Sequence, residues 1–223
     1  METETYYQYI RKLYTNNEQF QISELESKLM KHFRGTRPEV NAAIQRLISE
    51  KFIVLNGTSA SINLLANPIR NKIYSIICKY PGSYVNSLKT LLNLDTHQLI
   101  WHLGVLIELE LIEICEIGKI KAFGPKGTSR EEVIIGCLLF KDSIRCIFEV
   151  LLTHVQGISQ TTLAETTGMN RSTLAYIIDN LLHENLIEIN KDQTNARVIL
   201  KTNISELVRR RLALYEDILK NVK

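Results

Sequence analysis

The sequence of 223 residues is poor in the residue patterns that mark several protein classes. Its 4 cysteines, Cys78, Cys115, Cys137 and Cys146, form no CxxC pair, have no histidine at metal-ligand spacing, and lie among apolar neighbours. We therefore expect neither a disulfide nor a metal site. The simpler interpretation is that these cysteines are reduced and act as small hydrophobic core residues.

Long apolar runs are also missing, since none approaches the roughly 18 residues that can span a bilayer. The opening METETYYQYIRKLY is acidic and then aromatic, which is unlike a secretory signal. Catalytic motifs are absent too: the chain has no phosphate-binding glycine loop, GxSxG, HExxH or pair of carboxylates in an apolar setting. We expect a cytoplasmic protein without membrane insertion, cofactor or catalytic residues, and not an enzyme.

Charge of one sign is not in large excess. The net charge of +3 and the pI near 8.6 fall short of what a non-specific nucleic-acid coat requires. The most basic segment is the middle one, residues 67–130, with 8 cations against 5 anions. The apolar fraction of 45% is ordinary for a globular protein and is sufficient to build buried cores.

What the sequence does contain is a long internal repeat. Ile69 to Ile114 aligns without a gap on Ile144 to Ile189, which places Gly82 on Gly157 and brings the two LIEI stretches together. This repeat sets the domain count.

Each copy predicts the same order of elements: a helix, a glycine turn, a short helix, a third helix and a two-stranded hairpin. Asp95 and Asn170 precede the third helices and are suitable N-caps, because their side-chain oxygens can accept free backbone N–H groups. Each third helix has one stripe for burial: Leu99, Leu103 and Leu106 in one copy, and Leu174, Ile178 and Leu181 in the other. This order is the winged helix-turn-helix pattern.

A weaker copy precedes these two. It predicts a helix over Ile22 to Phe33, a second helix capped by Thr36, and a hairpin in FIVLNGTSASINLL. The expected fold is therefore mainly α with small β-hairpin wings (α+β). It consists of three tandem winged helix-turn-helix units at 1–66, 67–130 and 131–202, followed by a C-terminal helix at 203–223.

The closing segment, Ile204 to Val222, carries an apolar stripe near heptad spacing that includes Val208, Leu212 and Tyr215. One interpretation is a helix that makes a homodimer. The alternative is that it folds back onto the first helix of the third unit, because an apolar stripe needs cover in either case.

The stretches NPIRNKIYSIICKYPGS, LDTHQLIWHLGVLIELELIEI and GKIKAFGPKG resemble archaeal winged-helix transcription regulators of the broad ArsR and MarR kind. The third unit is similar, so the resemblance covers residues 68 to 202. It implies that each third helix enters the DNA major groove while the hairpin wing touches phosphates or the minor groove. Double-stranded DNA is then the expected partner.

This resemblance nominates exposed side chains at the starts of the third helices and in the wings. In the middle unit these are Thr96, His97, Gln98 and Trp101, with Lys119 and Lys121 in the wing. In the last unit they are Arg171, Ser172, Thr173 and Tyr176, with Lys191 and Arg197 beside the wing. Gln and Arg can pair with base edges, and lysines neutralise phosphate. Arg34 and Arg37 of the first unit add positive charge.

Other interpretations remain open. Trp101 and Tyr176 could pack inside their units, and His102, beside Leu103, is better explained as a partly buried histidine. The third helices carry few cations, with none between Asp95 and Leu111 and only Arg171 between Asn170 and Leu186, so phosphate attraction would be modest. This favours the alternative of a protein scaffold, as in ESCRT-II-like or RNA-polymerase-associated subunits. A third possibility is that one unit senses a small molecule.

Overall fold

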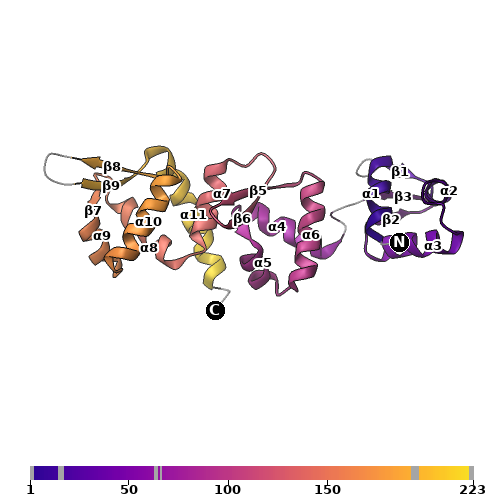
Figure 1. Ribbon diagram of the computed structural model, residues 1–223, viewed down its shortest axis with the longest axis horizontal. Coiled ribbons are helices and arrows are strands. Elements are labelled where there is room, and N and C mark those ends of the chain that lie inside the picture. Colours follow the sequence, from indigo (N-terminus) through magenta and orange to yellow (C-terminus); the bar gives the residue numbers. More distant parts are fainter. Residues whose placement is uncertain (1–2, 15–17, 63–64, 66, 192–195, 221–223) are drawn as a thin grey trace. The chain divides into compact units, whose positions relative to one another are not determined.

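The computed structural model describes residues 3–14, 18–62, 65, 67–191 and 196–220 (Figure 1). Within these residues the chain is mainly helical, with three antiparallel sheets of three short strands each. The predicted class, mainly α with small β-hairpins, is confirmed. The chain divides into two compact units, Met1–Lys72 and Ile73–Lys223, and the division falls inside helix α4, Pro68–Lys79.

The first unit holds three helices and one sheet before α4 begins. Its elements are α1 (Thr3–Leu13), β1 (Gln19–Phe20), α2 (Ile22–Phe33), α3 (Arg37–Ser49), β2 (Ile53–Asn56) and β3 (Ser59–Ile62). The sheet order is β1-β3-β2, with Leu55 opposite Ala60 in the hairpin.

The α2–α3 pair follows the sequence prediction. Thr36 and Glu39 form a capping box at the start of α3, in which the Thr36 backbone nitrogen donates to Glu39 Oε2 at 2.8 Å. The buried stripe of α3 is Val40, Ile44 and Leu47, as its helical spacing predicts.

Helix α1 was not predicted, although its sequence carries a signal. Tyr6, Tyr7, Ile10 and Tyr14 recur at helical spacing, and all four are buried in the first unit. The Tyr7 ring lies 4.3 Å from that of Phe52, centroid to centroid. This contact holds α1 against the residue that directly precedes β2. α1 is therefore the first helix of this unit, and the predicted helix over Ile22 to Phe33 is its second.

The second unit holds the rest of the chain. After α4 its elements are β4 (Ser83–Tyr84), α5 (Val85–Leu92), α6 (Thr96–Glu108), β5 (Ile112–Ile117), β6 (Ile120–Pro125), α7 (Arg130–Leu139), α8 (Asp142–Thr153), β7 (Ile158–Ser159), α9 (Gln160–Thr167), α10 (Arg171–His183), β8 (Ile187–Lys191), β9 (Ala196–Leu200) and α11 (Thr202–Lys220). The sheets have the orders β4-β6-β5 and β7-β9-β8.

The spacing of these elements matches the period seen in the sequence. The starts of α5 and α9 are separated by the same length of chain as Ile69 and Ile144, and so are the starts of α6 and α10. Asp95 and Asn170 cap α6 and α10 as predicted, because each side chain accepts hydrogen bonds from backbone N–H groups of the first turn. Both predicted stripes are buried.

Helix α7, which was not predicted, separates the middle segment from the last. After a charged first turn, its residues from Val133 to Leu139 are apolar and buried on every side, and a helical stretch of that kind must be covered all round. Val133 and Cys137 pack with Ala122 of β6, whereas Ile134 and Ile135 join the large core of the last segment.

A close backbone contact fixes α7 to the turn after α4. Gly82 has φ +94°, and a Cβ there would overlap the backbone of α7 at Val133 and Cys137. A Cβ on Gly136 would overlap the carbonyl oxygen of Pro81, which also accepts a 2.7 Å hydrogen bond from the Tyr215 hydroxyl. The two glycines thus allow the two backbones to meet.

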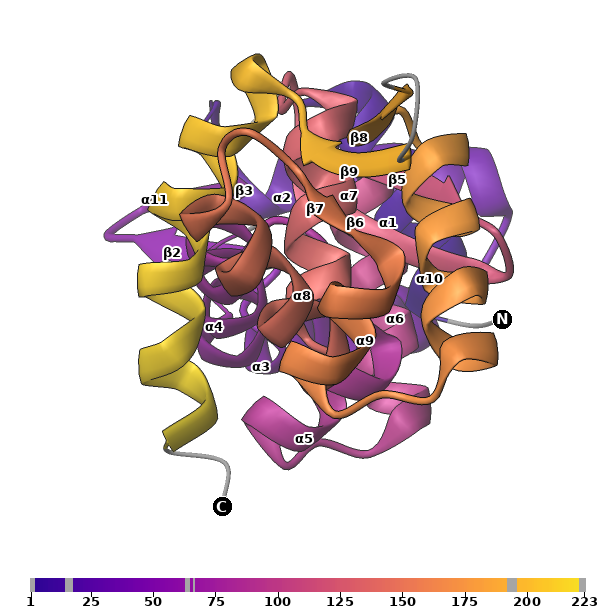
Figure 2. The same cartoon turned by 90° about the vertical axis from the view of Figure 1, so that its left-hand side faces the viewer.

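The closing helix α11 packs on its own chain. Ile204, Val208, Leu212 and Tyr215 of its stripe are buried against α7 and α8, so the fold-back interpretation holds for this part of the helix. The side chains of Ile218, Leu219 and Val222, which continue the predicted stripe, lie outside the described residues. Figure 2 shows α11 and α10 on opposite sides of the last segment, with α8 and α9 between them. A homodimer stays a prediction, and the four buried residues of α11 are not available to it.

Candidate nucleic-acid interface

The start of α6 presents the polar residues that the resemblance nominated. Asp95 Oδ1 accepts from the backbone nitrogens of His97 at 2.8 Å and Gln98 at 3.4 Å, and these donors lower the pKa of the Asp95 carboxyl. The side chains of His97 and Gln98 are exposed, and Thr96 is half-buried. The cap therefore holds the first turn in place while leaving its side chains free to reach a ligand.

The outward face of α6 is apolar further along. Trp101 is half-buried with its ring edge-on to His102, 4.7 Å between centroids, while His102 is 3% exposed and belongs to the core, as predicted. Ile100 is 53% exposed, and a Cβ on Gly104 would meet nothing within 4 Å. α6 thus exposes polar side chains at its first turn and Glu108 at its last, and it carries no lysine or arginine.

The hairpin β5–β6 carries the two predicted wing lysines. Lys119 lies in the turn between Ile117 and Ile120, and Lys121 lies on β6 opposite Glu116. Both side chains are exposed. Because Glu116 faces Lys121 across the strands, Lys119 is the less compensated of the two charges.

The start of α10 repeats this arrangement with other residues. Asn170 Oδ1 accepts from the Thr173 backbone nitrogen at 2.7 Å and from Ser172 Oγ at 2.9 Å. Arg171, Ser172 and Thr173 are exposed, and Tyr176 is 70% exposed. The alternative that Tyr176 packs inside its unit is therefore wrong. For Trp101, which is half-buried, the structure lies between the two interpretations.

The last hairpin contributes one described cation. Arg197 is exposed on β9, opposite Asn190 of β8 and Ser159 of β7. Lys191 ends β8, but its side chain lies outside the described residues. The neighbouring tip, residues 192–195, also lies outside them.

The two arginines predicted in the first unit differ in availability. Arg34 ends α2 with φ 50° and is exposed. Arg37 instead pairs with Glu26, Nε to Oε1 at 2.6 Å, and this hydrogen bond lowers the pKa of the Glu26 carboxyl. The positive charge expected from Arg37 is therefore largely compensated within the chain.

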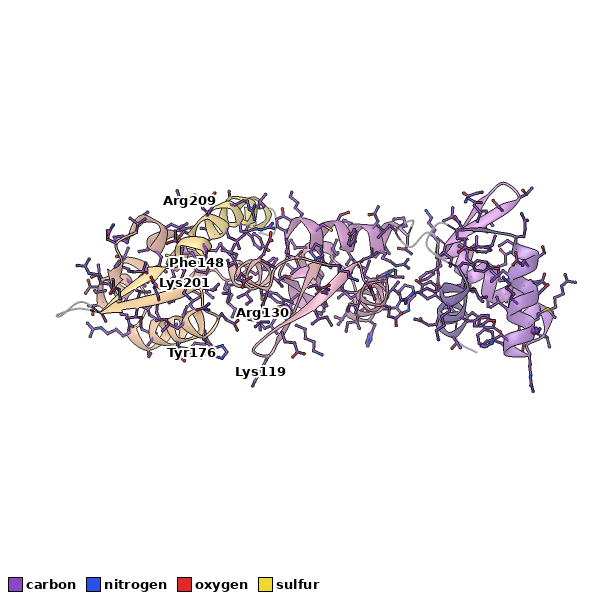
Figure 3. All side chains as sticks on the ribbon, turned by 90° about the horizontal axis from the view of Figure 1, so that it is seen from above. Lys119, Arg130, Phe148, Tyr176, Lys201 and Arg209 are labelled. Atoms are coloured by element: carbon purple, nitrogen blue, oxygen red, sulfur yellow. The ribbon has the colours of Figure 1, made fainter. Side chains whose placement is uncertain are left out.

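In the second unit, Lys119 and Tyr176 lie on one side and Arg209 on the other (Figure 3). Arg130, which the sequence interpretation left at a domain boundary, lies on the same side as Lys119 and Tyr176 and bonds to Cys115, Glu116 and Glu184. The only sequence signal for this arginine is its place at the start of an unpredicted helix, so pattern alone could not find its partners.

A shallow cavity of about 250 Å³ lies beside Arg130, lined by Cys115, Thr128 and Val133 among others. Burial raises the pKa of the Cys115 thiol. Within the described residues, no cluster of histidine, cysteine, aspartate or glutamate could hold a metal ion. Nor do these residues include a helix that is long and apolar enough to cross a membrane.

Comparison with known proteins gives matches to solved structures alone. No family model matches this chain, and no curated protein does. MepR, a transcription regulator of the multidrug efflux pump MepA of Staphylococcus aureus, shares 20% identity over 37% of this chain, with a TM-score of 0.33. This chain spans 62% of the length of MepR.

Two further solved structures match to a similar extent. A MarR-family transcriptional regulator from a Rhodococcus species has 16% identity, a TM-score of 0.35, and coverage of 41% of this chain and 64% of its own. The second is BpsR of Bordetella bronchiseptica, whose DNA binding is regulated by 6-hydroxynicotinic acid. It has 18% identity and a TM-score of 0.32, and the match covers 42% of this chain and 71% of BpsR. A likeness of this extent leaves open what this chain binds.

Proposed function

We propose that this chain is a cytoplasmic DNA-binding transcriptional regulator, not an enzyme, built from three tandem winged-helix units. α3, α6 and α10 are the recognition helices, and the hairpins β2–β3, β5–β6 and β8–β9 are the wings. The observation that carries the proposal is that α6 and α10, at equivalent positions of the internal repeat, each begin with a capped turn of exposed polar side chains. Such turns can approach base edges in the major groove.

Phosphate contacts must come from outside α6, because its exposed face has no cation. Lys119 and Lys121 of the middle wing, with Arg171 and Arg197 of the last segment, supply the positive charge. Affinity for DNA should accordingly be modest for one chain, and a homodimer would increase it.

Fluorescence anisotropy of the full chain on a random-sequence duplex tests this function. Repeated from about 50 to 200 mM salt, the logarithm of affinity falls with a slope near 0.9 for each neutralised phosphate. We expect a steep slope for the natural chain and a shallower one for the Lys119→Ala, Lys121→Ala variant. Absence of binding at the lowest salt would refute the proposal.

One observation favours a second candidate, a protein-binding scaffold. The exposed Ile100, the open position at Gly104 and the half-buried Trp101 give α6 an apolar face without cations, and protein interfaces are depleted in charge at their centres. Under this candidate, Ile100→Asp abolishes capture of a protein partner while the chain binds no duplex. Under the first candidate, the chain binds DNA in a salt-dependent manner.

A further inference from the structure

Arg130 joins the middle hairpin to the third helix of the following segment. This residue begins α7, directly after the hairpin β5–β6. Its guanidinium donates to Cys115 Sγ at 3.3 Å and to the Glu116 carbonyl at 3.4 Å, both at the end of β5. The same guanidinium lies 3.2 Å from Glu184 Oε2, at the C-terminal end of α10. One side chain therefore connects the base of the hairpin tip with the end of α10.

The same two elements also share one apolar core. Cys115 and Ile117 of β5 are half-buried and pack against the large core to which Leu174, Ile178 and Leu181 of α10 belong. In this ion pair the Glu184 side chain is 13% exposed and the Arg130 side chain 57%, so the carboxylate is held against the chain while the guanidinium stays partly in water. Together with the contact of Gly82 and Gly136, this packing fixes the hairpin relative to α10.

The outward stripe of α10 runs toward this junction. Ser172, Tyr176, Asp179 and His183 are all exposed and recur at helical spacing. Tyr176 and His183 are two helical turns apart, about 10.5 Å along the helix axis. Figure 3 shows Lys119 and Tyr176 on the same side of the second unit. The hairpin tip therefore extends the surface that the α10 stripe begins.

Among the cations of the hairpin and its junction, Lys119 is the least compensated. Arg130 is neutralised by Glu184, and Lys121 faces Glu116 across the strands. Lys119 forms no ion pair within the described part of the chain. Asp179, in the α10 stripe, would repel phosphate, so phosphate contacts lie at Arg171 at the start of α10 and at the hairpin beyond its end, rather than over the middle of the helix.

We propose that α10 and the hairpin β5–β6 form one binding face for a single stretch of duplex DNA. The first turns of α10 approach the groove, and Lys119 contacts the backbone beside it. The middle wing thus serves the recognition helix of the following segment rather than α6 of its own. This inference rests on the proposed function and adds to it that the last segment contacts the groove while the middle hairpin contacts the DNA backbone.

Directed cleavage of DNA tests the arrangement in the full chain. Single cysteines at Lys119, Ser172 or His97 are introduced into a Cys78→Ser chain, since Cys78 is exposed, and each is coupled to an iron chelate that cuts nearby DNA. The probe is the tightest-binding duplex selected from a random pool. The Cys78→Ser chain treated in the same way is the control for the three remaining cysteines.

We expect the cuts from position 119 to centre within about one helical turn, ~10 base pairs, of those from position 172. They should lie closer to the cuts from 172 than to those from 97. Cuts from 119 that coincide with those from 97, or no cuts from 119 on a bound duplex, would overturn this inference and leave the proposed function standing. Failure to select any duplex would overturn both.

Discussion

Two polar residues that the sequence nominated as helix caps carry much of the local order of the candidate interface. The Asn170 side chain accepts from the Thr173 backbone nitrogen at 2.7 Å at the start of α10. Replacing an N-cap of this kind by alanine costs about 1 kcal/mol. We expect Asn170→Ala to lose about that much unfolding free energy in urea. The matched control Asn180→Ala, on the exposed face of the same helix, should change it by less than about 0.5 kcal/mol.

The cap at Asp95 is charged, so its contribution depends on pH. The N–H groups of His97 and Gln98 lower the pKa of this carboxyl in the folded chain. A lowered folded pKa stabilises the fold above the ordinary value of about 3.9, and this stabilisation is lost as pH falls through the folded pKa. We expect the difference in unfolding free energy between the natural chain and Asp95→Asn to diminish below pH ~4. A difference that stays constant with pH would contradict this account.

The Tyr215 hydroxyl is buried, and the exposed Tyr176 provides a matched control for its removal. The Tyr215 hydroxyl donates to the Pro81 carbonyl at 2.7 Å in the interior, whereas Tyr176 is 70% exposed. Tyr215→Phe leaves that carbonyl without its buried donor, which costs about 1 to 3 kcal/mol. We expect Tyr176→Phe to leave the midpoint of urea unfolding unchanged. Equal effects of the two variants would contradict the role given to the Tyr215 hydroxyl.

Individual residues were predictable where a single local rule governs them. Asp95, Asn170 and Thr36 cap helices as predicted, and His102 is in the core because it adjoins a buried stripe. Partners distant in sequence were not predictable. No sequence pattern indicates that Glu26 neutralises Arg37, or that Glu184 binds Arg130, since each pair is brought together by the fold.

At the scale of elements, α7 meets the turn after α4 with its backbone in direct contact. A Cβ on Gly136 would overlap the backbone carbonyl of Pro81, which cannot move aside on its own, and would also meet the buried Tyr215 hydroxyl. We expect Gly136→Ala to cost about 3 kcal/mol of unfolding free energy, at the upper end for overpacking.

The control for Gly136→Ala is Gly104→Ala, for which we expect a change in unfolding free energy of the opposite sign. A Cβ there meets nothing within 4 Å in the exposed face of α6. Gly104→Ala should stabilise the fold by about 0.5 to 1 kcal/mol, because alanine favours the helix. Thermal or urea unfolding of both variants measures the contrast. A destabilising Gly104→Ala would indicate a neighbour that the described residues do not include.

Elements were predicted when their periodicity was clean and missed when it was not. The stripes of α3, α6 and α10 recur at helical spacing, and their hairpins alternate, so these elements followed from the pattern. From Val133 on, α7 is apolar on all sides and gives no such period. α1 carries the period in its tyrosines, but only the fold shows that they are buried.

At the scale of the whole molecule, the two compact units should unfold separately. Trp101 is the single tryptophan of the chain and lies in the second unit, so tryptophan fluorescence reports on that unit alone. Leu29→Ala removes a fully buried side chain from the first unit, at a cost of about 2 to 5 kcal/mol. We expect this substitution to lower the midpoint of the first unit's unfolding transition, followed by circular dichroism. The midpoint of the transition followed by tryptophan fluorescence should stay unchanged. A shift of both would show that the units unfold together.

The sequence by itself determined the internal repeat, the mainly helical class with small hairpins, the capped third helices and their buried stripes. These follow from short-range rules of spacing and hydrogen bonding, which operate within one helix or hairpin. Only the tertiary structure decided that α11 folds back on α7 and α8, that Arg130 ties the middle hairpin to α10, and that Lys119 shares a side with Tyr176. Those decisions depend on which surfaces meet across long separations in sequence, and burial and ion pairing select them once the chain is packed.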